Sequence, residues 1–164
     1  MKQIGLYKRG ALKPKMFALV DDEDYEFLNK FDWYYRVGNK TFYARTYIKG
    51  KTVEMHMLLC PTVYPIQVDH KNGNGIDNQK QNLRPATYSQ QQANNVSRRK
   101  GSSQYRGVCW NTKEQKWVAQ LILNGVKQFL GYYTSEKEAA LVYNNAAIKH
   151  FGEFAKLNGV LPNG

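Results

Sequence analysis

The sequence has few cysteines and no long apolar run, and each shortage excludes a class of protein. Its 164 residues include two cysteines, Cys60 and Cys109, which form no Cys-x-x-Cys pair, so a structural zinc site is not expected and a reducing compartment fits. No apolar stretch is long enough to span a membrane, and the start lacks the pattern of a secretory signal. We therefore expect an intracellular, cytoplasmic protein with no membrane partner.

Acidic residues are also scarce, with 13 against 24 lysines and arginines, which gives a formal net charge of +11 and a sequence pI near 9.6. This balance favours a polyanionic partner, most simply nucleic acid, although a basic face can also be only a solvated surface. The acids bunch in residues 21–24, where Asp21 or Asp22 is expected to cap a short helix that runs to about residue 29.

The first third of the chain predicts short strands and small helices. Residues 1–15 carry five cations among glycine and proline and are expected to be an extended basic arm, which either follows a phosphate backbone or frays. Residues 16–20 form a short buried strand, and residues 32–37 and 41–48 form a hairpin of aromatic and β-branched residues. Residues 52–60 begin as a strand or turn and become a short helix that ends before Pro61.

The stretch Val68–Thr87 has the order strand, loop, strand, helix. The first strand ends in Asp69-His70, a turn-rich loop follows, and Asn82 precedes the second strand. Thr87 opens the helix, with Gln90 as its capping-box partner. A carboxylate for a divalent cation and a neutral imidazole for a water molecule suit metal-assisted phosphodiester hydrolysis.

The missing metal ligand of this site must come from the helix. Gln91 and Asn94 are three residues apart there, so they share one face, and their amide oxygens suit a hard cation. The alternative for the whole stretch is a polar surface loop with a structural histidine.

Residues 53–95 resemble the HNH nuclease motif, in the branch found in homing endonucleases of phages and introns. The resemblance implies that Asp69 is a metal ligand, that His70 is the general base, and that Asn82 fixes the catalytic loop by hydrogen bonds. Its third element is usually His or Asn. Here that position holds Gln91, so Asn94 is kept as a rival ligand.

The same resemblance implies a metal cofactor and draws attention to a second histidine, His56. The cofactor is one divalent metal ion, magnesium or else manganese, and no small-molecule cofactor is expected. His56 lies where nucleases of this branch often carry a histidine. It either contacts a phosphate near the scissile bond or is a satisfied, partly buried side chain.

A polar, basic segment at residues 96–104 predicts a linker, and a second unit follows it. Residues 105–110, 116–123 and 126–133 are predicted strands, with Asn124-Gly125 as a hairpin turn. Ser135 and Glu138 form a capping box for a helix that runs to about Phe151. One sheet face packs on this helix, and by alternation the other face is lined by Lys116, Gln120, Ile122, Lys127 and Phe129.

This second unit resembles the Apetala-type (AP-two/ERF) DNA-binding domain. The matching pieces are Tyr105-Arg106-Gly107-Val108, Lys116-Trp117-Val118-Ala119, Leu130-Gly131-Tyr132-Tyr133 and the closing residues 152–158. The resemblance implies a three-stranded sheet that enters the major groove. It places base or phosphate contacts at Arg106, Trp110, Lys116, Gln120, Ile122, Lys127 and Phe129.

The sequence therefore predicts an α+β protein with an N-terminal HNH ββα-metal nuclease domain (1–95, core 53–95), which includes a small β-hairpin subdomain. A basic linker (96–104) and a C-terminal three-stranded antiparallel sheet packed on one helix (105–164) complete it. The expected function is site-specific cleavage of double-stranded DNA by a monomeric homing endonuclease, in a phage-infected or bacterial cell. The residues expected to position the DNA backbone are Arg84, Arg98, Arg99 and Lys100.

Two other functions fit the same residues. A non-catalytic DNA-binding regulator derived from a nuclease is suggested by Gln91 at the third motif position. A nuclease that acts on RNA would use the same phosphate chemistry. The predicted sheet, however, suits a B-form major groove, and the major groove of A-form RNA is too deep and narrow for side chains to read.

Overall fold

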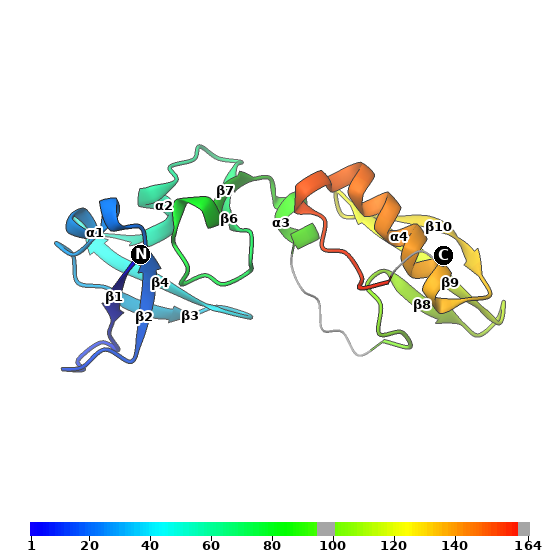
Figure 1. The fold of residues 1–164 in the computed structure, drawn as a ribbon, viewed down its shortest axis with the longest axis horizontal. Coiled ribbons are helices and arrows are strands. Elements are labelled where there is room, and N and C mark those ends of the chain that lie inside the picture. The colour runs from blue at the N-terminus through cyan, green and yellow to red at the C-terminus, as the bar shows by residue number, and fades with distance from the viewer. Residues whose placement is uncertain (95–100, 161–164) are drawn as a thin grey trace. The chain divides into compact units, whose positions relative to one another are not determined.

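The computed structural model describes residues 1–94 and 101–160, and the chain has an α+β fold with small antiparallel sheets. It separates into two compact units, Met1–Tyr88 and Ser89–Gly164, whose elements are labelled in Figure 1. Each unit has a hydrophobic core of its own. Within the described residues, no helix is both long enough and apolar enough to cross a membrane.

The first unit begins with a β-hairpin, where the cations had predicted an extended arm. Strand β1 (Lys2–Leu6) pairs antiparallel with β2 (Met16–Val20). Ile4 and Leu6 are buried and alternate with more exposed residues, which is the period of a half-buried strand. Burial of these two side chains fixes the segment. Lys2 lies in β1, and the other four cations are in the connecting loop, 7–15.

A second, three-stranded sheet follows in the same unit. Strands β3 (Tyr34–Val37) and β4 (Phe42–Ile48) form the predicted hairpin, and β5 (Lys51–Glu54) pairs on the other side of β4. Helix α2 (Met55–Leu59) continues directly from β5, as predicted for residues 52–60. The chain then runs through an exposed loop to the next strand.

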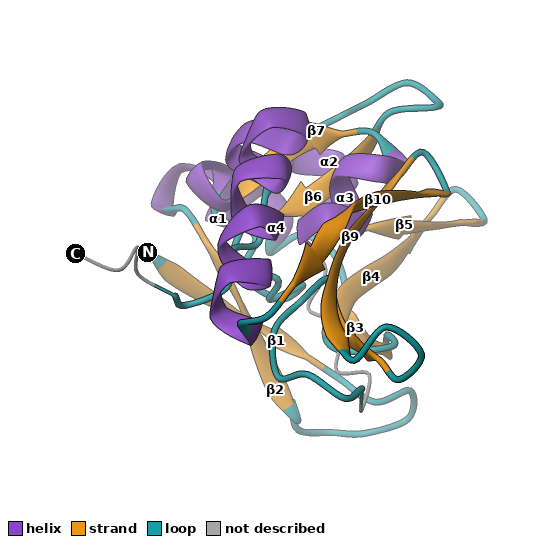
Figure 2. Cartoon of the chain, turned by 90° about the vertical axis from the view of Figure 1, so that its right-hand side faces the viewer, coloured by secondary structure: helices purple, strands orange, loops and turns teal. Residues whose placement is uncertain are grey.

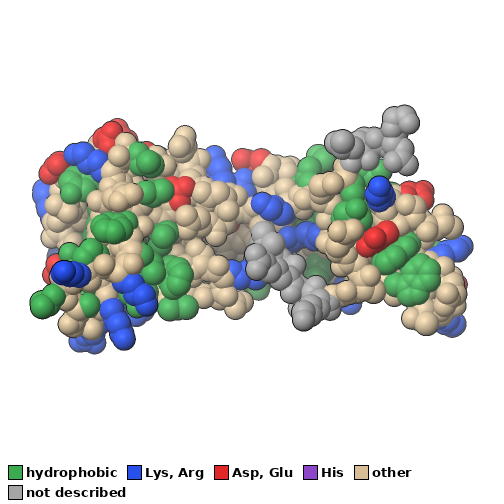
Figure 3. Space-filling model, turned by 60° about the horizontal axis from the view of Figure 1, so that its bottom comes forward, with side chains coloured by type: hydrophobic (Ala, Val, Ile, Leu, Met, Phe, Trp, Pro, Cys, Tyr) green, Lys and Arg blue, Asp and Glu red, His purple; other side chains and the backbone are tan. Residues whose placement is uncertain are grey.

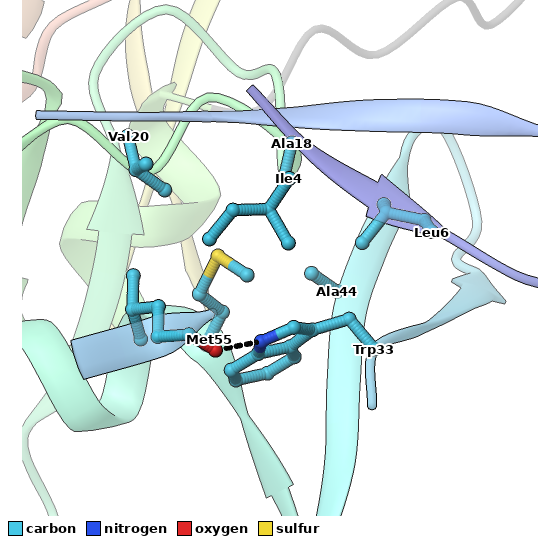
Figure 4. Close-up of a cluster of buried hydrophobic side chains, with 8 residues drawn as sticks. Ile4, Leu6, Ala18, Val20, Trp33, Ala44 and Met55 are labelled. Atoms are coloured by element: carbon cyan, nitrogen blue, oxygen red, sulfur yellow. Dashed lines mark hydrogen bonds between the residues drawn. The ribbon is translucent and has the colours of Figure 1, made fainter. Parts of the chain in front are cut away.

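One compact core holds these elements together (Figure 4). Trp33 is almost fully buried at its centre, and its indole Nε1 donates a hydrogen bond of 2.8 Å to the Leu28 carbonyl oxygen. A buried tryptophan needs such a partner because its N–H would otherwise be left unsatisfied. The other core residues come from both sheets, from the helix that ends at Leu28 and from helix α2: Ile4, Leu6, Ala18, Val20, Leu28, Ala44 and Met55.

The stretch that carries the nuclease-like motif is a two-stranded ribbon. Strand β6 (Gln67–His70) pairs antiparallel with β7 (Leu83–Ala86), and the short 3-10 helix η1 (Lys80–Asn82) leads into β7. The register places Asp69 opposite Arg84 and His70 opposite Leu83. Helix α3 (Tyr88–Asn94) begins at the boundary between the two units, and its residues from Ser89 onward group with the second.

The acidic cluster 21–24 does more than open helix α1 (Asp22–Leu28). Asp21 is the N-cap residue, but its side chain makes no capping hydrogen bond, which corrects that prediction. Its carboxylate instead accepts hydrogen bonds from Gln79 Nε2 (3.1 Å) and Lys80 N (2.8 Å). Nearby, Leu19 N donates to the Ile76 carbonyl, so the end of β2 and the following acids hold the far side of the 71–80 loop.

The second unit is a three-stranded antiparallel sheet covered on one face by a helix (Figure 2). Its strands are β8 (Val108–Asn111), β9 (Lys116–Leu123) and β10 (Val126–Tyr133), in the order β10-β9-β8. Asn124 and Gly125 both have positive φ, as a tight hairpin turn between β9 and β10 requires. The three strands lie within two or three residues of their predicted ranges.

Helix α4 (Glu136–Phe151) has the predicted start and end. The Ser135 hydroxyl accepts a hydrogen bond from Glu138 N. Gly152 follows the helix with a positive φ and is the first residue of the 3-10 helix η2 (Gly152–Phe154). Ala139, Ala140 and Ala147 of this helix are fully buried. Because their side chains are small, α4 can pack close to the sheet.

Candidate active site and nucleic-acid face

The candidate active site lies in the first unit, where β6 ends in Asp69 and His70. The chain turns sharply after His70, because Gly73 N donates to the His70 carbonyl (2.8 Å) and Gly73 has φ +76°. Gly75 is also required, since a Cβ atom there would lie 2.5 Å from the Phe42 carbonyl oxygen. These two glycines shape the loop that carries the polar residues of the site.

Asn82 is buried at the other end of this loop and hydrogen-bonds across it. Its Oδ1 accepts from Asn72 N (3.0 Å), and its Nδ2 donates to Asn72 Oδ1 (3.1 Å) and to the Asp77 carbonyl (2.8 Å). Asn72 Nδ2 in turn donates to Asp77 Oδ2 (2.7 Å). A single amide side chain therefore holds both ends of the loop in place, which the resemblance had implied for it.

His70 is buried, and its imidazole is tied to the loop. Nε2 lies 3.3 Å from Oδ1 of the fully buried Asn78. Burial lowers the pKa of His70 below its usual value, although the Asn78 hydrogen bond and the nearby Asp69 and Asp77 act in the opposite direction. The ring is therefore neutral at pH 7. An amide oxygen only accepts, so this contact is a hydrogen bond in the tautomer that carries the proton on Nε2, and that tautomer has its basic lone pair on Nδ1.

Two further rings pack against His70. The centroid of the His56 ring lies 5.1 Å from that of His70, and the Tyr43 ring lies 5.8 Å from His56 and 6.0 Å from His70. The Arg36 guanidinium lies over the Tyr43 ring, 4.6 Å from its centroid, and Arg36 Nε donates a hydrogen bond to the Glu54 carboxylate (2.8 Å). The rings of His56 and Tyr43 restrict how the His70 imidazole can turn.

His56 is predicted as a possible phosphate contact, and it lies in this cluster beside His70. Among the described atoms its buried Nδ1 has no hydrogen-bond partner. Burial, the charge of a protonated His70 and the Arg36 guanidinium together lower the pKa of His56 from 6.5 to about 3. His56 is thus held neutral.

Acid should weaken the first unit through His56. Its folded-state pKa lies below the ordinary value, so its stabilising effect is complete above pH 6.5 and is lost as the pH falls toward 3. Each pH unit in that window should cost about 1.4 kcal/mol of unfolding free energy. Urea unfolding at about pH 7 and about pH 5 should show wild type losing about 2 kcal/mol more than His56→Phe. Equal losses in the two proteins would show that His56 is not buried in its neutral form.

Asp69 and Arg84 form a buried ion pair across the β6–β7 ribbon. Arg84 Nε and Nη2 each lie 3.0 Å from Asp69 Oδ2, and the two residues are 7% and 8% exposed. Asp69 is the predicted metal ligand, and one of its oxygens is thus engaged by a guanidinium. Arg84 is predicted to contact the DNA backbone, and such a contact would require this pair to open.

The predicted ligands on the helix belong to the other unit. Gln91 and Asn94 lie on α3 within the second unit, where Arg106 Nη2 donates to the Gln92 carbonyl (2.7 Å) and Asn124 N donates to Ser89 Oγ. Among residues 1–94 and 101–160 there is no group of three or more His, Cys, Asp or Glu side chains that could hold a metal ion. Metal binding by Asp69 with an amide ligand stays a prediction.

The second unit presents one uncovered sheet face. Strand alternation and register place Lys116, Gln120 and Ile122 of β9 on it, with Phe129 opposite Gln120 and Lys127 opposite Ile122. Ile122 and Phe129 are 56% and 60% exposed. The Phe129 ring contacts the exposed Tyr132 ring, with their centroids 5.0 Å apart.

The remaining predicted DNA contacts lie elsewhere. Trp110 lies opposite Trp117 in the β8–β9 register, and the two rings meet edge-to-face with centroids 5.0 Å apart. Trp110 therefore lies on the face of Ala119, which α4 covers, and not with Phe129. Arg106 precedes β8, where its backbone N and carbonyl are bonded to the Asn158 side chain. Arg98, Arg99 and Lys100 lie outside the described residues.

Sequence reasoning missed Tyr43 and Asn78, which contact His70, and Arg36, which lies over the Tyr43 ring. Asn78 follows Asp77 in the predicted loop and could have been noted as an amide near the histidine. Tyr43 and Arg36 lie on the hairpin β3–β4, about thirty residues earlier, and no local pattern connects them with His70.

Comparison with known proteins identifies the family. No protein-family model matches the chain. No solved structure matches it either. The chain is 30% identical over 150 residues to an uncharacterized HNH endonuclease of Acanthamoeba polyphaga mimivirus, and the match covers 88% of this chain and 75% of that protein. With its Asp69-His70 strand end and a loop fixed by Asn82, the chain belongs to the HNH endonuclease family.

Proposed function

We propose that this protein is a metal-dependent, site-specific DNA endonuclease that works as a homing endonuclease. The observation that carries the proposal is the buried, neutral His70, held next to Asp69 at the end of the β6–β7 ribbon in a chain of the HNH endonuclease family. A neutral imidazole with an oriented ring is what a general base at neutral pH requires.

His70 takes the proton of the attacking water at Nδ1. The Asn78 amide oxygen holds Nε2–H, which fixes the tautomer, and the rings of His56 and Tyr43 fix the orientation. Asn82 keeps the loop closed around the site and does not touch the reacting atoms.

Asp69 would hold one divalent cation together with the amide oxygen of Gln91 or Asn94. Carboxylate and amide oxygens form the donor set that magnesium prefers, and manganese accepts the same ligands. Arg84 adds to the fit, because its guanidinium occupies one oxygen of the buried Asp69 carboxylate with a positive charge, which a metal ion would replace. When bound, the cation polarises the scissile phosphate and stabilises the leaving oxygen.

The second unit would read the DNA sequence as an AP-two/ERF-like domain, with its uncovered sheet face in the major groove. Lys116 and Lys127 supply charge there, Gln120 supplies an amide, and Ile122 and Phe129 supply apolar contact. Arg106 and the basic residues 98–100 would contact phosphates. Trp110, on the opposite face, would act by supporting the sheet.

The biological setting of this proposal is a mobile element in a phage-infected or bacterial cell, with the enzyme in the cytoplasm. One metal site per chain cuts one strand in each event. A monomer would therefore nick DNA, and a double-strand break would need two successive events.

Cleavage of supercoiled plasmid and phage genomic DNA tests the proposed function. With about 5 mM magnesium, a concentration in the range that saturates such oxygen sites, the protein should produce nicked or linear DNA with ends at discrete positions. EDTA should abolish the reaction, and manganese should restore it. Cleavage that persists in EDTA would contradict a metal-dependent enzyme, and ends at random positions would contradict site specificity.

A second candidate is a DNA-binding regulator that has lost cleavage. Two observations favour it: Gln91 stands where the family usually has His or Asn, and one oxygen of Asp69 is engaged by Arg84. It predicts metal-independent binding and no cutting with magnesium, manganese or calcium. Under that outcome, Gln91→Asn is the variant to test for restored cleavage.

A further inference from the structure

The loop between β1 and β2, residues 7–15, combines several cations with one exposed apolar residue in its outer part. Four of its nine residues are basic, and no acidic residue occurs anywhere in residues 1–20. Leu12 is 98% exposed, the most exposed of the large hydrophobic side chains described. Figure 3 shows Lys and Arg side chains gathered, with hydrophobic ones between them, over the end of the first unit where this loop lies. The basic residues are Lys8, Arg9, Lys13 and Lys15.

The base of the loop is held firmly by the rest of the first unit. Lys15 N donates to the Leu6 carbonyl (3.0 Å), which closes the loop. Tyr7 N donates to the Trp33 carbonyl (2.9 Å), and Tyr35 N donates to the Tyr7 carbonyl (3.2 Å). These bonds attach the loop to the buried core, so its outer residues project from a fixed position.

The outer part of the loop makes a turn that presents Leu12. Ala11 N donates to the Lys8 carbonyl (2.9 Å), and Gly10 adopts φ +83°, a conformation that favours glycine. Residues 8–13 are all exposed. The turn thus places Leu12 between flanking cations, where no protein surface covers it.

The cations of the loop are not neutralised within the protein. Lys2 and Lys80 of the same unit pair with Glu26 and with Glu23, whereas no loop cation forms an ion pair in the described part of the chain. Lys15 lies over the Tyr35 ring at 5.8 Å, which leaves its charge in place. An unpaired cationic loop gains most from a polyanion, because each phosphate contact releases counterions from the duplex.

We propose that the β1–β2 loop is a DNA-binding element separate from the active site and from the second unit, in which Lys8, Arg9 and Lys13 contact phosphates and Leu12 enters the minor groove. This inference rests on the proposed function, which makes DNA the substrate. A narrow turn with an apolar end fits the minor groove, where proteins often insert such a side chain against the bases, and the flanking cations then face the two phosphate backbones. A single exposed leucine is ordinary on a protein surface. Leu12, however, lies in a basic loop whose base is held by backbone hydrogen bonds to the core.

The salt dependence of binding tests the phosphate contacts. Fluorescence polarisation with an alternating A·T duplex of about 40 bp, without metal, gives log K against log salt between about 50 and 200 mM KCl. Lys8→Ala/Arg9→Ala/Lys13→Ala should lower the slope by about 2.7, at roughly 0.9 per phosphate contact. A matched triple variant, Lys30→Ala/Lys51→Ala/Lys137→Ala, removes the same charge from other exposed sites and should change the slope by less than about 1. Equal changes in both triples would overturn the proposal, because only net charge would then matter.

The minor groove is tested with Leu12 and a groove-binding drug. Leu12→Ser should weaken binding about fivefold and leave the salt slope unchanged, since only apolar contact is lost. A duplex saturated with netropsin should bind wild type and Leu12→Ser equally. A difference that persists with netropsin would overturn the groove assignment. If wild type binds no DNA, the proposed function fails; if wild type binds and cuts while the loop variants behave like it, only the loop proposal fails.

Discussion

Replacing His70 with alanine should slow magnesium-dependent DNA cleavage by about 10²–10⁴-fold, the contribution that a positioned general base makes to a reaction. DNA affinity should stay unchanged, because His70 is buried and presents no charge at neutral pH. The measurement is single-turnover cleavage of plasmid with enzyme in excess, alongside binding to the same DNA in calcium. His150→Ala is the matched control, because His150 is an exposed histidine on α4.

The pH profile separates a base from a structural histidine. Since burial lowers the pKa of His70, the neutral base persists below the usual titration range of histidine. The single-turnover rate of the wild type should therefore hold as the pH falls through 6.5 and decline only at lower pH. A cleavage rate that falls to half at the usual pKa of an exposed histidine would contradict a base with a lowered pKa. A His70→Ala variant that still cuts at the wild-type rate would exclude His70 as the general base.

Arg84→Met should destabilise the first unit by about 3–5 kcal/mol, because it leaves the buried Asp69 carboxylate without its partner. Urea unfolding followed by tryptophan fluorescence measures this loss, since Trp33 is at the centre of the core. Removing both charges with Asp69→Leu/Arg84→Met should recover much of it, as apolar replacements of buried ion pairs often do. The two single changes should therefore not be additive.

Arg36→Met is the control for the ion-pair prediction. Arg36 also pairs with a carboxylate in the same unit, that of Glu54, but its side chain is 38% exposed, against 8% for Arg84. Solvent screens such a pair, so its loss should cost about 1 kcal/mol or less. If the two arginine variants were equally destabilised, burial would not be what makes the Asp69–Arg84 pair important.

Local patterns in the sequence predicted much of the fold. The hairpin of β3 and β4, the three strands of the second unit and helix α4 all follow from alternation, an Asn-Gly turn and a capping box, which act over a few residues. The Asp69-His70 strand end and the turn-rich loop were likewise visible, because turn residues act locally. These local preferences predict the final structure because the tertiary contacts favour the same strands, turns and helix.

The remaining features depend on residues that are distant in the sequence. Arg84 was expected to position the DNA backbone, and only the β6–β7 register places it against Asp69. Residues 1–15 looked like an arm because their cations outweighed Ile4 and Leu6, whose partners are on β2. Asp21 had the sequence context of a helix cap, but backbone and side-chain donors 58 and 59 residues away bind its carboxylate instead.

The bonds from Leu19 and Asp21 to residues 76–80 also determine when the active site can form during folding. The chain must close a loop of nearly sixty residues before these bonds exist, and contacts at such separation form slowly because their closure entropy is high. The site should therefore be among the last parts of the first unit to become ordered. A peptide of residues 53–95 has every residue of the motif, yet it lacks the strand and the carboxylate that hold the far side of the loop. The smallest fragment able to cut DNA is thus expected to begin at the first β-hairpin rather than at the motif.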